Sequence, residues 1–347
     1  MSEHIPVFLA SDDFYAPFIA TTIASIMRHT QSFIDFYILT DGISDENKRK
    51  IDRLHEIYQN WTIEYLFVDT DKYLKDFPYI KAYSFASYNR YFIANLKPEI
   101  KKAIYSDVDV IYRDDIKKMY NIDLDGYGIG APIEELGKPL WGKWNHELRK
   151  KQLGISNQHN FFQSGNLIID CEYWRKNNIM ERCFELTQKY KNILVCPDLD
   201  VLNMIFENKY KRLDYRFSIC THIIGKEDGN TEMLNSYKKP FCIHYAGLNK
   251  PWKFPTVYFS DYFWECARQT PFYEEILLRM VQSNTVISNV AVNKEMLKHI
   301  TQRFKYRLRY LKYKLLKPFV FGKLRKKYKQ KKKKYKSLLK QIKNYLK

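Results

Sequence analysis

Residues 5–68 decide the fold class and read IPVFLASDDFYAPFIATTIASIMRHTQSFIDFYILTDGISDENKRKIDRLHEIYQNWTIEYLFV. Three apolar runs in this stretch are typical of buried strands, at 5–10, 34–39 and 62–68. The two segments between them have helical spacing, at 17–28 and 45–58. The order strand, helix, strand, helix, strand predicts a parallel sheet with crossover helices and therefore an α/β fold.

Further elements follow this core in a less regular order. We expect helices at 84–96 and 198–206 and strands at 103–105, 127–133, 161–169 and 241–245. The apolar pattern thins out between residues 280 and 299, where Ser, Asn and Thr are frequent. We therefore expect one globular domain over residues 1–285 and a separate C-terminal segment over residues 286–347.

The positive charge of the chain lies in one segment. Residues 300–347 contain 20 Lys or Arg and no Asp or Glu, and the other 299 residues contain 38 basic and 39 acidic residues. The body is therefore close to neutral. A protein built throughout to bind nucleic acid would carry basic charge on its folded surface, so we do not expect nucleic acid to be a partner of the body.

Cysteine usage and apolar patterns indicate a cytoplasmic chain. None of the six cysteines lies in a Cys-x-x-Cys pair, which argues against a zinc cluster, and their scatter argues against a disulfide scaffold. The N-terminus has neither the charged head nor the apolar run of a signal peptide. No stretch reaches the roughly 18 apolar residues of a membrane span, so we expect any membrane contact to be peripheral.

The triplet Asp107-Val108-Asp109 follows the strand expected at 103–105 and is the first candidate site. Because side chains alternate along a strand, both carboxylates are expected on one side, where they repel each other unless a cation lies between them. A divalent ion with oxygen ligands, Mn²⁺ or Mg²⁺, fits such a pair and can neutralise a diphosphate leaving group. The alternative is two solvated loop acids, since acidic triplets also arise by chance.

The segment HYAGLNKPW at 244–252 favours a metal and phosphate site. His244 can supply the nitrogen ligand that a Mn²⁺ site accepts. Gly247 lets the backbone approach a phosphate closely, and Lys250 offers a point charge to a phosphate oxygen. A lone histidine after a strand is more often structural, but the grouping of these three residues within seven positions favours a functional role.

Together, HYAGLNKPW, SDVDV at 106–110 and VFLASDDFY at 7–15 resemble glycosyltransferase family 8 over about residues 5–271. This family contains bacterial lipopolysaccharide and lipooligosaccharide galactosyl- and glucosyltransferases, and it is related to glycogenin. The resemblance implies a GT-A fold, which is a Rossmann-like mixed sheet with flanking helices that binds nucleotide sugars. It also implies transfer with retention of the anomeric configuration.

The resemblance further implies roles for individual residues. It implies a metal site of Asp107, Asp109 and His244 and a uridine pocket lined by Ala10 and Asp12. It implies contacts with the diphosphate or the sugar by Arg90, Asp107, Ser164, Gly165, Asp198, Gly247 and Lys250. The alternatives from the residues alone are a stacked surface role for Arg90, a helix N-cap at Asp198, and a turn shaped by Ser164 and Gly165. The choice of Asp12 over its neighbour Asp13 rests on the resemblance.

Three positions depart from the family pattern. Leu199 stands where members commonly have Gln, Phe14 where Asn is common, and Gln163 where Asn is frequent. We expect the departures to bear on donor preference and on the fine mechanism rather than on the fold or the metal site.

We therefore expect a metal-dependent, retaining hexosyltransferase with UDP-galactose or UDP-glucose as donor. The expected acceptor is lipopolysaccharide, lipooligosaccharide or another membrane-linked surface glycan. The metal would stabilise the leaving UDP, and Arg90 and Lys250 would add positive charge. Asp198 and Asp200 are the carboxylates that could act as nucleophile. With Leu199 between them, we favour attack on the same face of the sugar while UDP departs.

The segment at 300–347 is expected to dock on an anionic membrane surface. Apolar residues recur there at helical spacing among Lys and Arg: Phe304, Leu308, Leu311 and Leu315. Pro318 and Gly322 predict a break into two helices. Basic amphipathic helices with aromatic residues suit anionic membranes, so we expect a peripheral location on the inner face of the cytoplasmic membrane.

Two readings compete with this one. The first is a nucleic-acid-binding protein driven by the basic tail, and the second is a member of the family without activity. The intact Asp107-Val108-Asp109 and HYAG segments argue against an inactive member.

Overall fold

The computed structural model describes residues 4–78, 85–133, 146–155, 161–224, 231–316 and 322–345. The chain divides into two units, residues 1–279 and residues 280–347, which are described separately. The domain boundary expected at 285/286 falls inside one continuous helix, α12 (Tyr273–Leu316), and stays a prediction.

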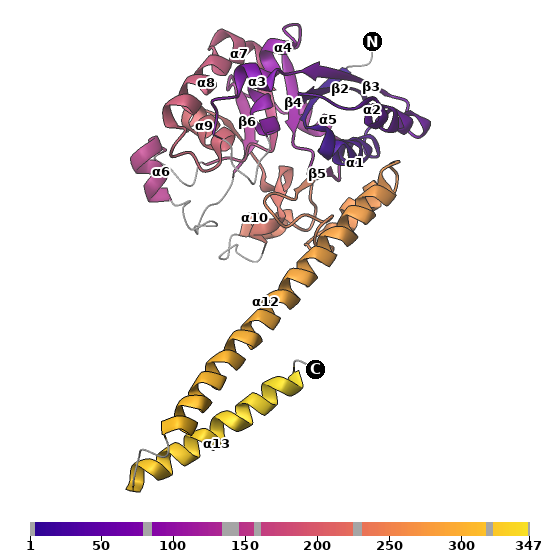
Figure 1. The fold of residues 1–347 in the computed structure, drawn as a ribbon. Helices are drawn as coiled ribbons and strands as arrows, with labels where there is room; N and C mark the ends of the chain where they lie inside the picture. The colour runs from indigo at the N-terminus through magenta and orange to yellow at the C-terminus, as the bar shows by residue number, and fades with distance from the viewer. Residues whose placement is uncertain are drawn as a thin grey trace. The chain divides into compact units, whose positions relative to one another are not determined.

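The first unit begins with the alternation that residues 5–68 predict (Figure 1). Its opening elements are β1 (His4–Ala10), α1 (Ala16–Met27), β2 (Phe33–Thr40), α2 (Asp45–Asp52) with a 3₁₀ turn at Arg53–Glu56, and β3 (Trp61–Phe67). The strands pair in parallel, β1 with β2 and β2 with β3. Local sequence fixes the helix ends, because Pro17 lies in the first turn of α1 and the Ser44 hydroxyl caps α2.

The central sheet has seven strands in the order β3-β2-β1-β4-β7-β6-β8. The later strands are β4 (Lys102–Ser106), β6 (Ile129–Pro132), β7 (Asn166–Asp170) and β8 (Lys211–Leu213). β4 is parallel to β1, whereas β7 is antiparallel to both β4 and β6. The sheet is therefore mixed, which confirms the expected α/β architecture.

Alternate side chains of the sheet enter two hydrophobic cores, one on each face. Phe8 and Leu167 belong to the core that includes α7 (Cys171–Lys176), α8 (Ile179–Tyr190) and α9 (Pro197–Phe206). Val7 and Ile168 belong to the core that includes α1 and α11 (Ser260–Ala267). The period of two along each strand thus produces a three-layer domain.

A second, three-stranded sheet joins two distant parts of the sequence. It consists of β5 (Val110–Tyr112), β10 (Cys242–His244) and β9 (Ile219–Cys220), in the order β5-β10-β9. β10 is antiparallel to β5, with His244 opposite Val110. This register brings the HYAG segment directly beside the Asp107-Val108-Asp109 triplet.

Several expected elements differ in extent or type. The segment expected as a helix at 84–96 is a 3₁₀ helix, η3 (Phe85–Phe92), followed by α4 (Ile93–Leu96). The strand expected at 161–169 begins only at Asn166. No sequence pattern marked β5, β8, β9, α7, α8, α11, α3 (Thr70–Tyr73), α5 (Lys117–Tyr120), α6 (His146–Leu153) or α10 (Thr231–Ser236) in advance.

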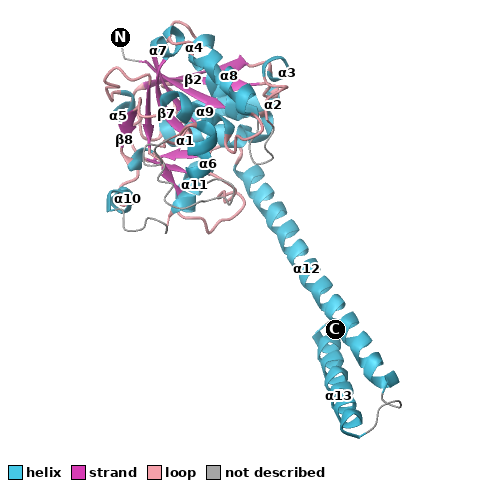
Figure 2. Cartoon of the chain, turned by 90° about the vertical axis from the view of Figure 1, so that its left-hand side faces the viewer, coloured by secondary structure: helices cyan, strands magenta, loops and turns pink. Residues whose placement is uncertain are grey.

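The second unit holds the rest of α12 and α13 (Gly322–Tyr345), which lie side by side (Figure 2). The rings of Tyr306 and Tyr335 are tilted against each other and those of Tyr313 and Tyr328 meet edge to face, with centroids 5.8 and 5.0 Å apart, so the two helices form an antiparallel hairpin. Lys331 Nζ donates to the Tyr313 hydroxyl at 3.3 Å. The two helices expected in this segment are present, with α12 ending at Leu316 and α13 beginning at Gly322, and Pro318 lies outside the described residues. None of the described helices is long and apolar enough to cross a membrane.

Candidate active site

A cleft of about 240 Å³ opens at the carboxyl ends of β1 and β4, where ligands commonly bind in open α/β sheets. Every site residue expected from the sequence lines this cleft except Asp200. The expected residues that line it are Ala10, Asp12, Arg90, Asp107, Asp109, Ser164, Gly165, Asp198, His244, Gly247 and Lys250.

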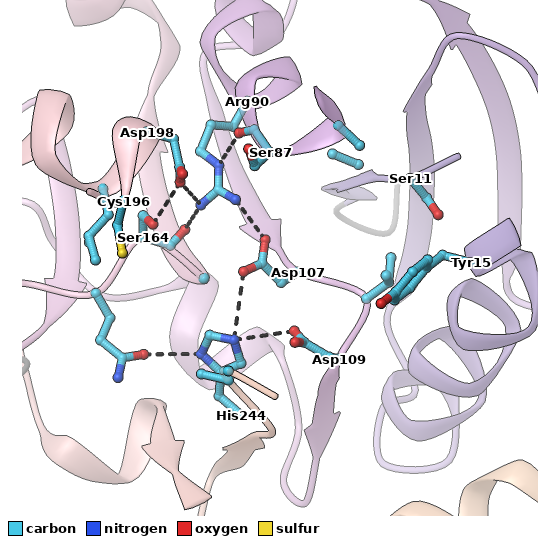
Figure 3. Close-up of a pocket in the computed structure, with 18 of the residues that line it drawn as sticks. Ser11, Tyr15, Ser87, Arg90, Asp107, Asp109, Ser164, Cys196, Asp198 and His244 are labelled. Carbon is cyan, nitrogen blue, oxygen red and sulfur yellow. Dashed lines mark hydrogen bonds and ion pairs between the residues drawn. The ribbon is translucent and has the colours of Figure 1, made fainter. Parts of the chain in front are cut away.

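Asp107, Asp109 and His244 converge in the cleft (Figure 3). One possible ligand atom from each residue lies within 4.8 Å of the others. His244 Nε2 is 3.2 Å from Asp109 Oδ1 and 3.6 Å from Asp107 Oδ2. The two carboxylates meet because residues 107–109 form a turn between β4 and β5. The expected explanation, alternation along a continuing strand, is therefore wrong for this triplet.

The surroundings of these residues fit a divalent cation. Asp109 Oδ1 is buried, and apart from its contact with His244 Nε2 no hydrogen-bond donor in the described part of the chain reaches it, which leaves lone pairs available to a cation. A Cβ at Gly165 would lie 2.8 Å from Asp107 Oδ2 and 2.3 Å from His244 Cε1, so only glycine fits beside the ligand atoms. Two carboxylates and one imidazole suit Mn²⁺, with Mg²⁺ as the alternative.

Each of the three residues has a pKa that depends on the charges of its neighbours. Burial would lower the pKa of His244, but the Asp109 carboxylate outweighs burial and raises that pKa well above its ordinary value. Burial would raise the pKa of Asp109, yet Lys250 and His244 hold it below its usual range. Burial raises the pKa of Asp107 despite the nearby Arg90. In the metal-free site the proton therefore lies on His244, where a divalent ion would replace it.

Arg90 joins the Asp107 carboxylate to Asp198 on α9 (Figure 3). Its Nη2 donates to Asp107 Oδ1 at 2.9 Å, and its Nη1 lies 3.2 Å from Asp198 Oδ2. The guanidinium also lies 4.5 Å above the centre of the Tyr105 ring. The Arg90 side chain is 3% exposed, which excludes the alternative of a stacked surface residue.

Asp198 and Asp200 have different surroundings although both lie in the first turn of α9. Asp198 accepts a hydrogen bond from the Ser164 hydroxyl at 3.0 Å and lines the cleft. The N-cap of α9 is Cys196, so Asp198 is not the N-cap that the alternative proposed. Asp200 is fully buried, and its Oδ2 accepts from the backbone amides of Val195 and Cys196 at 3.0 and 3.1 Å. Asp200 therefore stabilises the turn before α9 from outside the cleft.

The turn after β1 separates Asp12 from Asp13. Asp12 lines the cleft and caps the short 3₁₀ helix η1 (Asp13–Tyr15) by accepting from the Tyr15 amide at 3.0 Å. Asp13 instead binds Asn47 and Ser44 beside α2. This geometry favours Asp12 over Asp13 as the residue that faces a ligand.

Arg279, in the first turns of α12, supports η1. Its Nη1 donates to the carbonyl oxygen of Phe14, and its guanidinium lies 4.2 Å above the centre of the Phe14 ring. The cation therefore stacks on an aromatic face, an interaction that an Asn at position 14 could not make.

The loop after β10 carries the remaining expected residues. Gly247 has φ +80°, a left-handed conformation that favours glycine, and it lines the cleft. Lys250 Nζ pairs with Asp109 Oδ2 and donates to the Tyr245 carbonyl oxygen at 2.7 Å. Lys250 is thus held beside the proposed metal ligands.

The cleft also contains residues that sequence reasoning missed. Tyr15, Tyr105 and His222 line it, and the Tyr105 hydroxyl donates to Asp107 Oδ1 at 2.6 Å. Tyr105 could have been found from its place two residues before Asp107 on the expected strand. His222 lies on a short 3₁₀ helix, η6 (Thr221–Ile223), in a stretch without any recognised pattern.

Residues 6–256 match the protein family described as glycosyl transferase family 8. The chain belongs to glycosyl transferase family 8. The match covers most of the first unit and contains every residue of the expected site. The chain is therefore a glycosyltransferase, as its resemblance to the family implies.

Similar proteins from several bacteria support membership in family 8. A putative glycosyltransferase of Haemophilus influenzae is 31% identical over 72% of this chain and 74% of its own length. The lipopolysaccharide 1,3-galactosyltransferase of Salmonella typhimurium is 26% identical over 85% of this chain and 87% of its own length. The lipopolysaccharide 1,2-glucosyltransferase of Escherichia coli K12 is also 26% identical, over 77% and 78%.

Solved structures share the fold. The galactosyltransferase LgtC, in complex with donor and acceptor sugar analogues, matches with a TM-score of 0.65 and 22% identity, over 77% of this chain and 96% of that chain. The bifunctional glycosyltransferase WbbM matches with a TM-score of 0.69 and 23% identity, over 81% of this chain and 52% of that chain. The first unit of this family 8 member thus has the GT-A fold.

Proposed function

We propose that this chain transfers galactose or glucose from a UDP-sugar to a membrane-linked surface glycan, with a divalent metal and with retention of configuration. The observation that carries the proposal is one cleft in which Asp107, Asp109 and His244 meet beside Lys250 and Arg90. Relatives that act on lipopolysaccharide with galactose or glucose support the choice of sugar and acceptor class.

In this proposal, different residues of the cleft bind the metal, the diphosphate and the uridine. Asp107, Asp109 and His244 would hold Mn²⁺ or Mg²⁺, which would supply positive charge to the leaving diphosphate. Gly247 and Lys250 would bind the diphosphate. Ala10 and Asp12 would contact the uridine.

Asp198, Ser164 and Gly165 would bind the donor hexose. The Ser164 hydroxyl and the Arg90 guanidinium orient the Asp198 carboxylate, which therefore can accept from sugar hydroxyls in a fixed direction. Arg90 would add positive charge near the breaking bond.

The surroundings of the carboxylates support same-face attack over a covalent intermediate. Asp200 is buried among backbone amides, which leaves it without a path to the sugar. Asp198 is engaged by Arg90, which weakens it as a nucleophile. Leu199, which lies between Asp198 and Asp200 in the sequence, lines the cleft and has no polar side-chain group. We therefore assign Asp198 and Arg90 to orientation and charge stabilisation, and we do not retain Asp200 among the catalytic groups.

The C-terminal segment would bring the enzyme to its acceptor. Residues 300–347 carry 20 basic and no acidic residues, and Leu311 and Leu315 are exposed on α12. Basic charge with apolar side chains suits the anionic inner face of the cytoplasmic membrane. In this proposal residues 1–285 form the catalytic domain and residues 286–347 bind the membrane surface.

A donor screen tests the proposal. We expect Mn²⁺-dependent hydrolysis of UDP-galactose or UDP-glucose by the full chain, abolished by EDTA and restored by added Mn²⁺. GDP-mannose and UDP-N-acetylglucosamine serve as comparison donors. Equal rates with and without EDTA would refute the metal site, and hydrolysis of neither UDP-hexose would refute the donor.

A further inference from the structure

His244 can bind the proposed metal only through the nitrogen that faces the carboxylates. Its Nε2 lies 3.2 Å from Asp109 Oδ1, so this nitrogen is the one that points to the metal position. A neutral imidazole carries one proton, and that proton must be on Nδ1 if Nε2 is to donate its lone pair. The hydrogen bond at Nδ1 therefore decides whether His244 can act as a ligand.

Gln163 makes that hydrogen bond from a buried position. Its Oε1 is 3.1 Å from His244 Nδ1 and also accepts from the Ser218 hydroxyl at 2.8 Å. The side-chain amide nitrogen of Gln163 contacts Cys220 Sγ. Gln163 and Ser218 are each only 4% exposed, so water does not replace these partners.

The chemistry of the amide fixes the direction of the bond. Oε1 has only lone pairs, so the hydrogen between it and Nδ1 must belong to the histidine. Cys220 Sγ lies 3.7 Å from the same Nδ1, but sulfur is the weaker acceptor and is farther away. Gln163 Oε1 is therefore the group that holds the proton on Nδ1.

We propose that Gln163 is a positioning residue that keeps the proton of His244 on Nδ1 and thereby reserves Nε2 for the metal. This inference rests on the proposed metal site. It assigns a role to one of the three departures from the family pattern, because Gln163 here faces the histidine from behind the site. Such partners behind metal ligands typically contribute a factor of about 10 to 100 in metal affinity.

An amide of Gln163 turned so that its nitrogen faces His244 Nδ1 would lead to the opposite prediction for metal binding. If the amide nitrogen of Gln163 faced Nδ1, the histidine proton would move to Nε2 and block the metal. Two substitutions separate the orientations. Gln163→Glu in its ionised form presents two oxygens that can only accept from Nδ1–H, whereas Gln163→Met keeps the length of the side chain and removes the amide oxygen.

Mn²⁺ binding to the full chain, followed by electron paramagnetic resonance of free Mn²⁺, is the first measurement. We expect Gln163→Met to weaken binding about 10- to 100-fold and Gln163→Glu to bind at least as tightly as the wild type. Gln269→Met is the matched control, because Gln269 accepts a hydrogen bond from the Tyr58 hydroxyl at 2.7 Å and is not among the residues of the cleft. Thermal unfolding checks that each variant folds.

Nitrogen-15 spectra of labelled histidine are the second measurement, with Cd²⁺ as a diamagnetic probe. We expect the metal-bound His244 to carry its proton on Nδ1 in the wild type and in Gln163→Glu. A proton on Nε2, wild-type affinity in Gln163→Met, or equally weak binding in both variants would overturn the inference. If the wild type itself binds no Mn²⁺, the proposed metal site fails together with the inference. If the wild type binds Mn²⁺ and Gln163→Met binds it equally well, only the inference about Gln163 fails.

Discussion

In the cleft, each buried cation lies against carboxylates, whereas in the basic C-terminal segment, residues 300–347, described cations lie against tyrosine rings. Arg90 contacts Asp107 and Asp198, and Lys250 contacts Asp109. Arg309 and Lys331 lie 5.8 and 5.4 Å from the centres of the Tyr335 and Tyr313 rings, in a segment that has no acidic residue.

Positive charge therefore serves two purposes in this chain, one in the buried cleft and one in the C-terminal segment. A buried cation must be paired because desolvation of an isolated charge costs several kcal/mol, and pairing also fixes its position for chemistry. Exposed cations without acidic partners remain free to meet an anion outside the protein, at a strength that depends on salt. We therefore expect that substitutions in the cleft impair catalysis, that loss of the basic segment impairs membrane binding, and that each effect occurs without the other.

The largest expected effect comes from the cleft. Asp109→Asn removes a charged ligand from the proposed metal, and loss of several kcal/mol of charge stabilisation lowers turnover by about 10³-fold or more. UDP-sugar hydrolysis with Mn²⁺ measures this loss, and vesicle binding should stay at the wild-type level. Asp125→Asn, which removes only a surface pair with Lys211, is the control. Wild-type turnover in Asp109→Asn would contradict the proposal that Asp109 binds a metal needed for catalysis.

Removal of the basic segment is expected to have the converse effect. A chain that ends at His299 loses all 20 basic residues of the segment but keeps every cleft residue. Because each basic residue near an anionic surface contributes about 1 kcal/mol, vesicle binding should fall by at least about 10²-fold while UDP-sugar hydrolysis persists.

Co-sedimentation with anionic vesicles, neutral vesicles and RNA measures the binding of the full and shortened chains. For the full chain we expect salt to release most of the protein from anionic vesicles. Tight, salt-sensitive RNA binding without preference for vesicles would favour the nucleic-acid reading instead. Equal vesicle binding by the shortened chain would refute the docking role.

The pH response should also distinguish the two regions. The pKa of His244 is raised above its ordinary value, because Asp109 outweighs the effect of burial, so the metal-free site holds a proton at neutral pH. The metal must displace this proton, and Mn²⁺ affinity should therefore rise with pH, by up to about tenfold per pH unit below that pKa.

Calorimetric titration of Mn²⁺ in buffers of different ionisation enthalpy measures both the affinity and the proton release. Residues 300–347 contain no histidine, the side chain that changes its charge most readily near neutral pH. Vesicle binding should therefore change little with pH near neutrality. Metal affinity that is independent of pH would contradict the proposed role of His244.

The smallest expected effect concerns Leu199. Leu199→Gln introduces a polar group at the cleft, and we expect a change of up to about tenfold in the ratio of rates with UDP-galactose and UDP-glucose. Leu199→Met, which keeps an apolar side chain of similar size, should leave the ratio unchanged. An unchanged ratio in Leu199→Gln would show that this position does not contact the sugar.

The regular half of the fold was predictable because it depends on local pattern. Buried strands in residues 5–68 are apolar runs, and Pro17 and Ser44 mark the helix ends. The later half depends on tertiary context. β7 begins only at Asn166 because residues before it enter the cleft, where the Gly165 carbonyl oxygen accepts from the Asp107 amide at 2.8 Å.

The site residues, too, were predictable from local sequence only in part. Motifs identified its members, but only the fold could distinguish Asp198 from Asp200. Residues two positions apart on a helix point in nearly opposite directions, so one carboxylate enters the cleft and the other binds backbone amides. Gln163 meets His244 from a segment 81 residues away, which no local pattern can reveal.

The support of η1 by Arg279 sets a practical limit on how the chain can be divided. The family match ends at residue 256, yet Phe263, Phe272 and Ile276 are buried in the core of the first unit. A fragment of family length would lose these side chains and also the cation of Arg279 that stacks on Phe14 in η1. The smallest autonomous catalyst must therefore extend at least through Arg279, and a shorter expression product would fail for reasons unrelated to its chemistry.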